Sequence, residues 1–115
     1  MKSILVIDDE SLILNFLSNL LTRKGYLVDT AESGKEGIKK IDENKYALII
    51  TDIEMPGISG NEVIRYLRNG KKSSTPVIGI SGTPWRLKLD LFDAALKKPC
   101  LTEELLSTVR ALINE

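Results

Sequence analysis

Strand-length apolar runs alternate along this chain with longer segments in which apolar residues recur at every third or fourth position. The predicted strands occupy residues 4–7, 27–31, 47–51, 77–80 and 94–97, and the first, third and fourth of them are continuously apolar up to their last residue. Continuously apolar strands are typical of a parallel sheet that is buried on both faces, and alternation with helices is the element order that builds such a sheet. The sequence therefore predicts an α/β fold in which helices cover both faces of a parallel sheet.

The segments between the predicted strands carry helix start and stop signals. The apolar positions of the first helix are Leu12, Ile13, Phe16, Leu17, Leu20 and Leu21. Gly25 follows them as a C-terminal cap. Thr102 opens the last helix, and the two acids after it suit the positive end of a helix dipole. Residues 82–93 show no clear pattern.

Two further helices begin with a capping box, in which a Ser is followed three residues later by a Glu. Ser33 with Glu36 starts one helix, and Ser59 with Glu62 starts the other. In this arrangement each side chain accepts a hydrogen bond from the other residue's backbone amide, which satisfies two N–H groups at the helix end. Both helices follow a predicted strand directly, as βα units require.

Length and composition limit the chemistry that the chain can perform. With 115 residues and 43% hydrophobic content it can bury a core without disulfides, and we expect a single domain over residues 1–115. Cys100 is the only cysteine, and the chain has no histidine. An internal disulfide, the usual zinc ligands and the commonest general base are therefore excluded.

The balance of charge bears on the partners. The 16 basic residues are matched by 16 acidic ones, without a long run of either sign. Nucleic acids and anionic membranes attract basic surfaces, so we expect neither as a direct partner. The apolar runs are too short to span a membrane, and acids interrupt the N-terminal run too early for a secretory signal. These features favour a cytoplasmic location.

Four of the predicted strands end on polar side chains that can support chemistry. The runs "ILVID", "LIITD" and "VIGIS" end on Asp8, Asp52 and Ser81, and Lys98 follows the last run. The carboxyl ends of parallel strands share one edge of the sheet, where ligands bind. A second acid, Asp9, comes directly after the first run. The sequence thus predicts an acidic site with a lysine and a hydroxyl nearby.

Converging carboxylates without histidine or thiol ligands form a hard oxygen site that suits Mg²⁺. The charge of the ion would offset the repulsion between the acids and leave positions for a phosphate oxygen. A carboxylate can itself attack a phosphoryl group to form an aspartyl phosphate. Asp52 fits the role of the nucleophile, and Lys98 and Ser81 fit the role of stabilising the transferred charge.

Each of these residues also has a purely structural alternative. An acid before a helix is often an N-cap, and Asp52 before a Pro-Gly turn could form an Asx turn. Ser81 could be an ordinary loop hydroxyl and Lys98 a solvated lysine. Their common position at strand ends favours a site over four separate structural roles.

The motifs "VIDDE", "LIITDIEMPGISG", "ISG" and "KKP", in this order, resemble the receiver domain of two-component response regulators over essentially the whole chain. The resemblance implies a flavodoxin-like, doubly wound sheet of five parallel strands in the order 2-1-3-4-5, with five helices. It also implies a phosphorelay function, in which a histidine kinase or histidine phosphotransfer protein is the donor. Such a protein is a signalling component and not a turnover enzyme.

The resemblance assigns a role to each matching residue. Asp52 is the phosphoacceptor, Ser81 the switch hydroxyl, and Lys98 the partner of the phosphoryl group. The implied Mg²⁺ ligands are Asp9, Asp52, the backbone carbonyl of Glu54 and, largely through water, Asp8.

The chain departs from the family pattern at two places. Ala95 stands where an aromatic residue usually precedes the lysine by three positions. The stretch from Ser81 to Lys98 is also shorter than usual by more than a helical turn, which predicts a shortened or missing fourth helix. We therefore expect the output to use residues 82–89, with Trp85 as a contact surface or as filling for the lost helix, and the protein to stay monomeric.

Three other functions are compatible with parts of the pattern. A phosphatase of the haloacid-dehalogenase type needs a second Asp two residues after the nucleophile, but Glu54 is there and the chain has no room for a cap domain. A flavodoxin-like electron carrier needs a phosphate-binding loop where this chain has acids. A receiver-like interaction module that is never phosphorylated has no need of the complete acid set.

Overall fold

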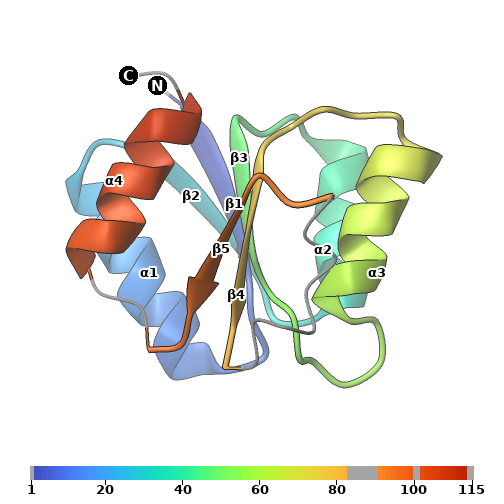
Figure 1. The fold of residues 1–115 in the computed structure, drawn as a ribbon, viewed down its shortest axis with the longest axis horizontal. Coiled ribbons are helices and arrows are strands. Elements are labelled where there is room, and N and C mark those ends of the chain that lie inside the picture. The colour runs from blue at the N-terminus through green and yellow to red at the C-terminus, as the bar shows by residue number, and fades with distance from the viewer. Residues whose placement is uncertain (1, 83–90, 100–101, 114–115) are drawn as a thin grey trace.

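The computed structural model describes residues 2–82, 91–99 and 102–113 and contains a five-stranded sheet. The strands are β1 (Ser3–Ile7), β2 (Leu27–Ala31), β3 (Leu48–Asp52), β4 (Val77–Ser81) and β5 (Ala94–Lys97). All neighbouring strands pair in parallel, in the order β2-β1-β3-β4-β5 (Figure 1). The predicted sheet and its strand order are confirmed.

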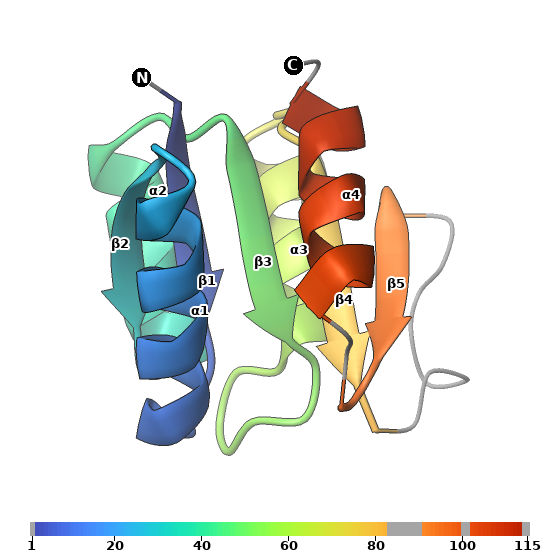
Figure 2. The ribbon, with the colours of Figure 1, turned by 90° about the vertical axis from the view of Figure 1, so that its left-hand side faces the viewer.

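Helices cover both faces of this sheet. One face carries α1 (Ser11–Arg23) and α4 (Thr102–Ile113), and the other carries α2 (Gly34–Glu43) and α3 (Gly60–Arg65) (Figure 2). A π-helical turn, η1 (Tyr66–Gly70), continues α3. The helix labelled α4 follows β5 and is the last helix predicted from Thr102. None of the described helices combines the length and the apolarity needed to cross a membrane.

The connection between β4 and β5 is where a shortened or missing fourth helix was expected. Gly82 and residues 91–93, which flank the strands there, contain no helix. Residues 83–90, including Trp85, lie outside the described residues, so the expected contact surface at Trp85 stays a prediction.

Two hydrophobic cores lie on opposite sides of the sheet because successive strand residues point to opposite faces. In β1, Ile4 and Val6 pack into the core under α1 and α4, whereas Leu5 and Ile7 pack under α2 and α3. Every residue of β3 and β4 is buried. The three central strands are therefore rigid supports for whatever their ends carry.

The first helix buries a narrower stripe than its apolar sequence suggests. Leu14, Leu17 and Leu21 face the core, while Leu12 is 83% exposed and Phe16 is 51% exposed. At 100° per residue, positions 12 and 16 lie well to one side of a stripe centred on position 17. Apolar periodicity thus predicts the helix correctly but includes two side chains that remain in solvent.

The capping boxes form as predicted at α3 and only in part at α2. Ser59 and Glu62 make both reciprocal bonds. Ser33 Oγ accepts from the Glu36 amide at 3.1 Å, but the Glu36 carboxylate accepts from the amide of Glu32, one residue before the cap. Both versions satisfy amides at the helix start.

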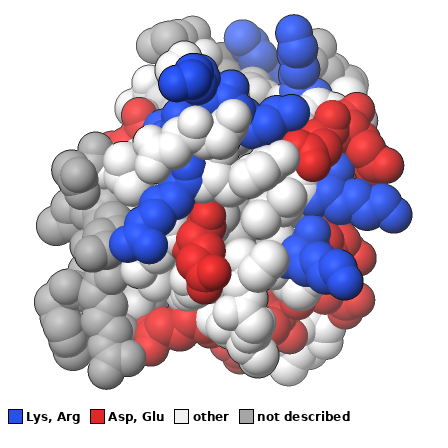
Figure 3. Space-filling model, turned by 90° about the vertical axis from the view of Figure 1, so that its right-hand side faces the viewer, with Lys and Arg blue, Asp and Glu red and all other residues white. Residues whose placement is uncertain are grey.

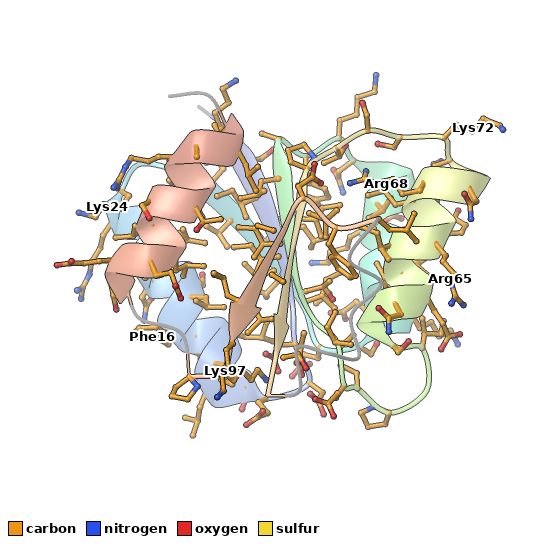
Figure 4. All side chains as sticks on the ribbon, in the orientation of Figure 1. Phe16, Lys24, Arg65, Arg68, Lys72 and Lys97 are labelled. Atoms are coloured by element: carbon orange, nitrogen blue, oxygen red, sulfur yellow. The ribbon has the colours of Figure 1, made fainter. Side chains whose placement is uncertain are left out.

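Charged side chains of both signs lie next to one another on the outer surface of α2 and α3 (Figure 3). Two arginines of this region differ in the direction of their side chains. Arg68, in η1, points toward the sheet, whereas Arg65 points away from it (Figure 4).

Arg68 joins the start of β4 to the start of β5. Its Nη1 donates to the carbonyls of Ser73 and Thr75 at 3.0 and 2.7 Å, and its Nε donates to the carbonyl of Leu91 at 3.2 Å. Its Nη2 lies 2.7 Å from Asp93 Oδ1, which also accepts from the amide of Val77 at 2.8 Å. One guanidinium group therefore fixes the backbone at the entrance to both strands.

We predict that Arg68→Ala lowers the free energy of unfolding by about 2 to 4 kcal/mol, because it leaves several partly buried acceptors without their charged donor. Arg65→Ala, one turn away on the exposed side, is the matched control and should change the value by less than about 0.5 kcal/mol. Urea denaturation of the two variants measures the difference. Equal effects would show that the Arg68 contacts contribute little.

Candidate functional site

The residues predicted to form a site meet at the carboxyl edge of the sheet. Asp8 follows β1, Asp52 ends β3, Ser81 ends β4 and Lys98 follows β5. The arrowheads in Figure 2 show that these four strand ends lie along one edge. The four side chains therefore come together although they are separated by up to 90 positions in the chain.

A tight group of acids forms at this edge. Asp8, Asp9, Glu10 and Asp52 each offer a carboxylate oxygen, and these oxygens all lie within 4.8 Å of one another. Asp8 and Asp52 are buried, whereas Asp9 and Glu10 are exposed. The grouping of the predicted acids is found, with Glu10 as an additional member.

In the part of the chain that the structure describes, Lys98 is the cation that pairs with this group. Its Nζ lies 3.1 Å from Asp52 Oδ1, 3.3 Å from Glu10 Oε1 and 3.4 Å from Asp8 Oδ2. Its backbone amide donates to the carbonyl of Ser81 at 2.9 Å, which fixes the lysine beside β4. Lys98 is therefore held by these contacts and is not freely solvated, and its role at the site stays a prediction.

The acids at the end of β1 do not cap α1. The N-cap residue of this helix is Glu10, and its side chain makes no capping bond. Asp8 Oδ1 instead accepts from the amide of Glu10 at 2.9 Å, before the helix begins. Asp52 Oδ1 likewise accepts from the amide of its neighbour Ile53 at 2.9 Å. These bonds orient the two buried carboxylates toward the site.

Burial sets the protonation behaviour of the two buried acids. Burial and the charge of Asp8 raise the pKa of Asp52 to about 6, although Lys98 and the Ile53 amide act in the opposite direction. Burial also raises the pKa of Asp8, partly offset by the Glu10 amide and Lys98. Burial alone would lower the pKa of Lys98, but the charges of Asp52 and Asp8 outweigh it and raise that pKa.

Among the described residues, one lysine faces four carboxylates, so this part of the ionised site carries an excess of negative charge. Its donors are all oxygens, which are the ligands that Mg²⁺ and Ca²⁺ take in proteins. Several of these oxygens are also close enough together to share one ion. The donor set therefore fits a hard divalent cation.

Ser81 and Glu54 make a contact that the sequence analysis missed. Ser81 is fully buried, and its Oγ donates to Glu54 Oε1 at 3.0 Å. Glu54 lies in the loop after β3 and was considered only for its backbone carbonyl. The sequence placed Glu54 two residues after the end of β3 and Ser81 at the end of another strand, but it gave no sign of the direction of the Glu54 side chain.

Ala95, which has no ring, occupies the position where the family usually has an aromatic residue. Ala95 lies in β5, is exposed and pairs in register with Gly79 of β4. Ala95 therefore presents only a methyl group beside Gly79, in the strand that carries Ser81.

An apolar surface lies beside the acidic site. A pocket of about 350 Å³ between α1 and the end of β5 is lined by Ile13, Phe16 and Pro99 together with Lys98. The exposed side chain of Leu12 continues this surface along α1. Figure 4 shows Phe16 on α1 at the same end of the molecule as the carboxyl edge. Sequence periodicity assigned these α1 residues to the helix without separating them from the core.

Comparisons with known proteins agree with this geometry. Residues 4–110 match the model of the response regulator receiver domain. The response regulator ArlR of Staphylococcus aureus is 35% identical over 99% of this chain. The match covers 53% of ArlR, so the chain spans about half the length of the curated relatives it matches.

Solved structures give the same result. The response regulator protein TrrA of Thermotoga maritima, in complex with Mg²⁺-BeF, is 40% identical and has a TM-score of 0.89, with 97% of this chain and 99% of that chain covered. TrrA in complex with the histidine kinase ThkA covers 97% of this chain and 98% of its own, with a TM-score of 0.87. The match of the family model and the shared fold identify this chain as a member of the response regulator receiver domain family.

Proposed function

We propose that this receiver domain accepts a phosphoryl group from a phosphohistidine donor on Asp52 and thereby serves a two-component phosphorelay. The observation that carries the proposal is the placement of the Asp52 carboxylate at the end of the central strand, 3.1 Å from the Lys98 ammonium and within the acidic group. In this role the chain is a signalling component of the cytoplasm and not a turnover enzyme.

In the transfer, an oxygen of the Asp52 carboxylate attacks the phosphorus atom. The P–N bond to the donor histidine breaks, and the imidazole leaves with the electron pair, so an acyl phosphate forms on Asp52. A pKa near 6 leaves the Asp52 carboxylate ionised at neutral pH, and a basic carboxylate is a good nucleophile. Lys98, whose Nζ lies 3.1 Å from Asp52 Oδ1, offsets charge on the transferred group.

Asp8, Asp9 and Asp52, with the backbone carbonyl of Glu54, would hold Mg²⁺. Support comes from the all-oxygen donor set and from its excess negative charge. When bound, the ion supplies positive charge to the acids and to the phosphoryl oxygens. The complex of TrrA with Mg²⁺-BeF is a further support.

The apolar surface of Leu12, Phe16 and Pro99 suits the contact with the donor protein. A phosphohistidine must approach Asp52 from the open edge of the sheet, and this surface borders that edge. Exposed aromatic and aliphatic side chains of this kind are common in protein interfaces. TrrA, whose structure is known in complex with the histidine kinase ThkA, supports a partner of this class.

We predict that acetyl phosphate adds one phosphoryl group to this chain in the presence of Mg²⁺ and that Asp52→Asn abolishes the addition. Intact-mass spectrometry measures the added mass. Excess EDTA should prevent the reaction in the wild type, because the acids would then lack the cation that offsets their charge.

Two exposed acids of the site allow a matched comparison of the metal requirement. Asp9→Asn should need at least about tenfold more Mg²⁺ for half-maximal modification, since it removes a proposed ligand. Glu10→Gln, which changes the neighbouring acid that pairs with Lys98, should raise the Mg²⁺ requirement much less than Asp9→Asn does.

Modification of Asp52→Asn at the wild-type rate, or full modification of the wild type in EDTA, would disprove the assignment of Asp52 as the phosphoacceptor.

We predict that Asp52 makes the metal-free protein less stable as pH rises from about 4 to 7. The folded protein holds the Asp52 proton up to a pKa of about 6, above the ordinary value of 3.8, so the unfolded chain releases it at lower pH. The stabilisation that this proton gives is present below pH 4 and is lost as pH passes 6. Asp52→Asn lacks this titration. Its free energy of unfolding should therefore rise by about 2 kcal/mol relative to that of the wild type between pH 4 and 7.

Urea denaturation in EDTA at several pH values measures this gain. The informative quantity is the difference between the free energies of unfolding of the two proteins, because groups that do not interact with Asp52 contribute equally to both. A difference that stays constant from pH 4 to 7 would contradict the raised pKa of Asp52.

We predict that Phe16→Ala lowers kcat/KM for phosphoryl transfer from a phosphorylated histidine kinase by about tenfold. This is the effect expected when an apolar contact at the centre of a protein interface is lost. The reaction with acetyl phosphate, which needs no protein contact, should change by less than about twofold. Leu27→Ala is the matched control, since Leu27 is 54% exposed but begins β2 at the opposite edge of the sheet. Equal losses with both donors would show that Phe16 supports the site and not the partner.

A further inference from the structure

The hydroxyl of Ser81 is engaged by an acid that lies outside the proposed catalytic set. Ser81 Oγ donates to Glu54 Oε1 at 3.0 Å. Ser81 is fully buried at the end of β4, whereas Glu54 is exposed in the loop after β3. An exposed glutamate can place its charge in water, so its position against a buried hydroxyl indicates a specific contact.

The backbone brings these two side chains together. Asp52 of β3 pairs in register with Ile80 of β4, and the amide of Ile53 donates to the Ile80 carbonyl at 3.1 Å. The amide of Gly60 donates to the Ile53 carbonyl at 3.0 Å, which returns the loop to its starting point. Glu54 therefore leaves the sheet directly beside the end of β4.

A side chain at position 60 would prevent this close return. A Cβ atom there would overlap the backbone carbonyl of Asp52, so only glycine lets α3 start against the end of β3. The loop that carries Glu54 is thus held at both ends.

A serine hydroxyl has a single proton to donate. In the proposed function that proton serves an oxygen of the phosphoryl group on Asp52. In this structure it serves the Glu54 carboxylate, and hydrogen bonds to a charged acceptor are stronger than those between neutral groups. The two acceptors therefore compete for one proton.

We propose that Glu54 is a positioning residue that holds the Ser81 hydroxyl in the unphosphorylated state and so opposes formation of the phosphorylated state. This inference rests on the proposed function, in which Ser81 donates to the phosphoryl group. Because Glu54 is exposed, its carboxylate stays in contact with water when Ser81 changes acceptor. The identity of this one side chain then sets how readily the domain is switched on.

Binding of beryllium fluoride in the presence of saturating Mg²⁺ tests the proposal, with calorimetric titration as the readout. Glu54→Ala should lower Kd by about threefold to tenfold, the equivalent of one net hydrogen bond. The substitution keeps the backbone carbonyl at position 54, so the proposed Mg²⁺ ligand is retained. Glu54→Gln keeps an acceptor but not its charge and should give a smaller decrease.

Ser81→Ala separates competition for the hydroxyl from simple charge repulsion. If Glu54 acts through Ser81, then adding Glu54→Ala to Ser81→Ala should change Kd by less than about twofold. An equal decrease in both backgrounds would mean that Glu54 merely repels the anion, and the inference would be wrong.

The wild type distinguishes failure of this inference from failure of the proposed function. Binding by the wild type with an unchanged Kd in Glu54→Ala would overturn the role of Glu54 alone. Absence of binding by the wild type would overturn the proposed function and this inference with it.

Discussion

The ammonium group of Lys98, within 3.4 Å of three carboxylates, is the contact on which the edge of this sheet depends. Asp8 and Asp52 are buried beside one another, and each disfavours the ionised form of the other. A buried acid pair of this kind is costly unless a cation or a proton accompanies it. Lys98 supplies part of the required positive charge, and the remaining negative charge of the carboxylates can be balanced by a divalent cation.

The position of Lys98 depends in turn on how β5 is attached. This strand pairs with β4 alone, and its backbone continues past the sheet to the Lys98 amide, which donates to the carbonyl of Ser81. At the other end of β5, Arg68 binds Asp93 and the carbonyl of Leu91. The Arg68 guanidinium and the Lys98 backbone amide thus hold opposite ends of the same edge strand.

Local patterns and one rule of topology were sufficient to predict the strands, the helices and the gathering of the acids, whereas the order of the strands came from the family resemblance. Parallel strands that end on polar residues place them at a common edge wherever the strands lie in the chain. Arg68 was not predicted, because a long side chain in a helical turn carries no local sign of partners in two distant loops. The exposure of Phe16 was also missed, since periodicity alone does not give the width of the buried stripe.

The Ser81–Glu54 hydrogen bond was missed for a different reason. The sequence analysis singled out both residues but did not predict a contact between their side chains. Glu54 was considered for its backbone carbonyl, and its side chain has no neighbour in sequence that reveals its direction. Only the register of β3 against β4 places it beside Ser81. Such contacts depend on where a loop turns, and composition does not encode that turn.

The absence of a ring at Ala95 gives this hydrogen bond more weight. Where an aromatic side chain moves together with the hydroxyl, the energy of switching is shared between a polar contact and apolar packing. Ala95 is exposed and small, so this position of β5 has no ring that could take part in such a packing change. Under the proposed function, the exchange of acceptors at Ser81 must then supply a larger part of the difference between the two states. A single net hydrogen bond is worth only about 1 kcal/mol, so the balance is sensitive to the acceptor that Glu54 provides.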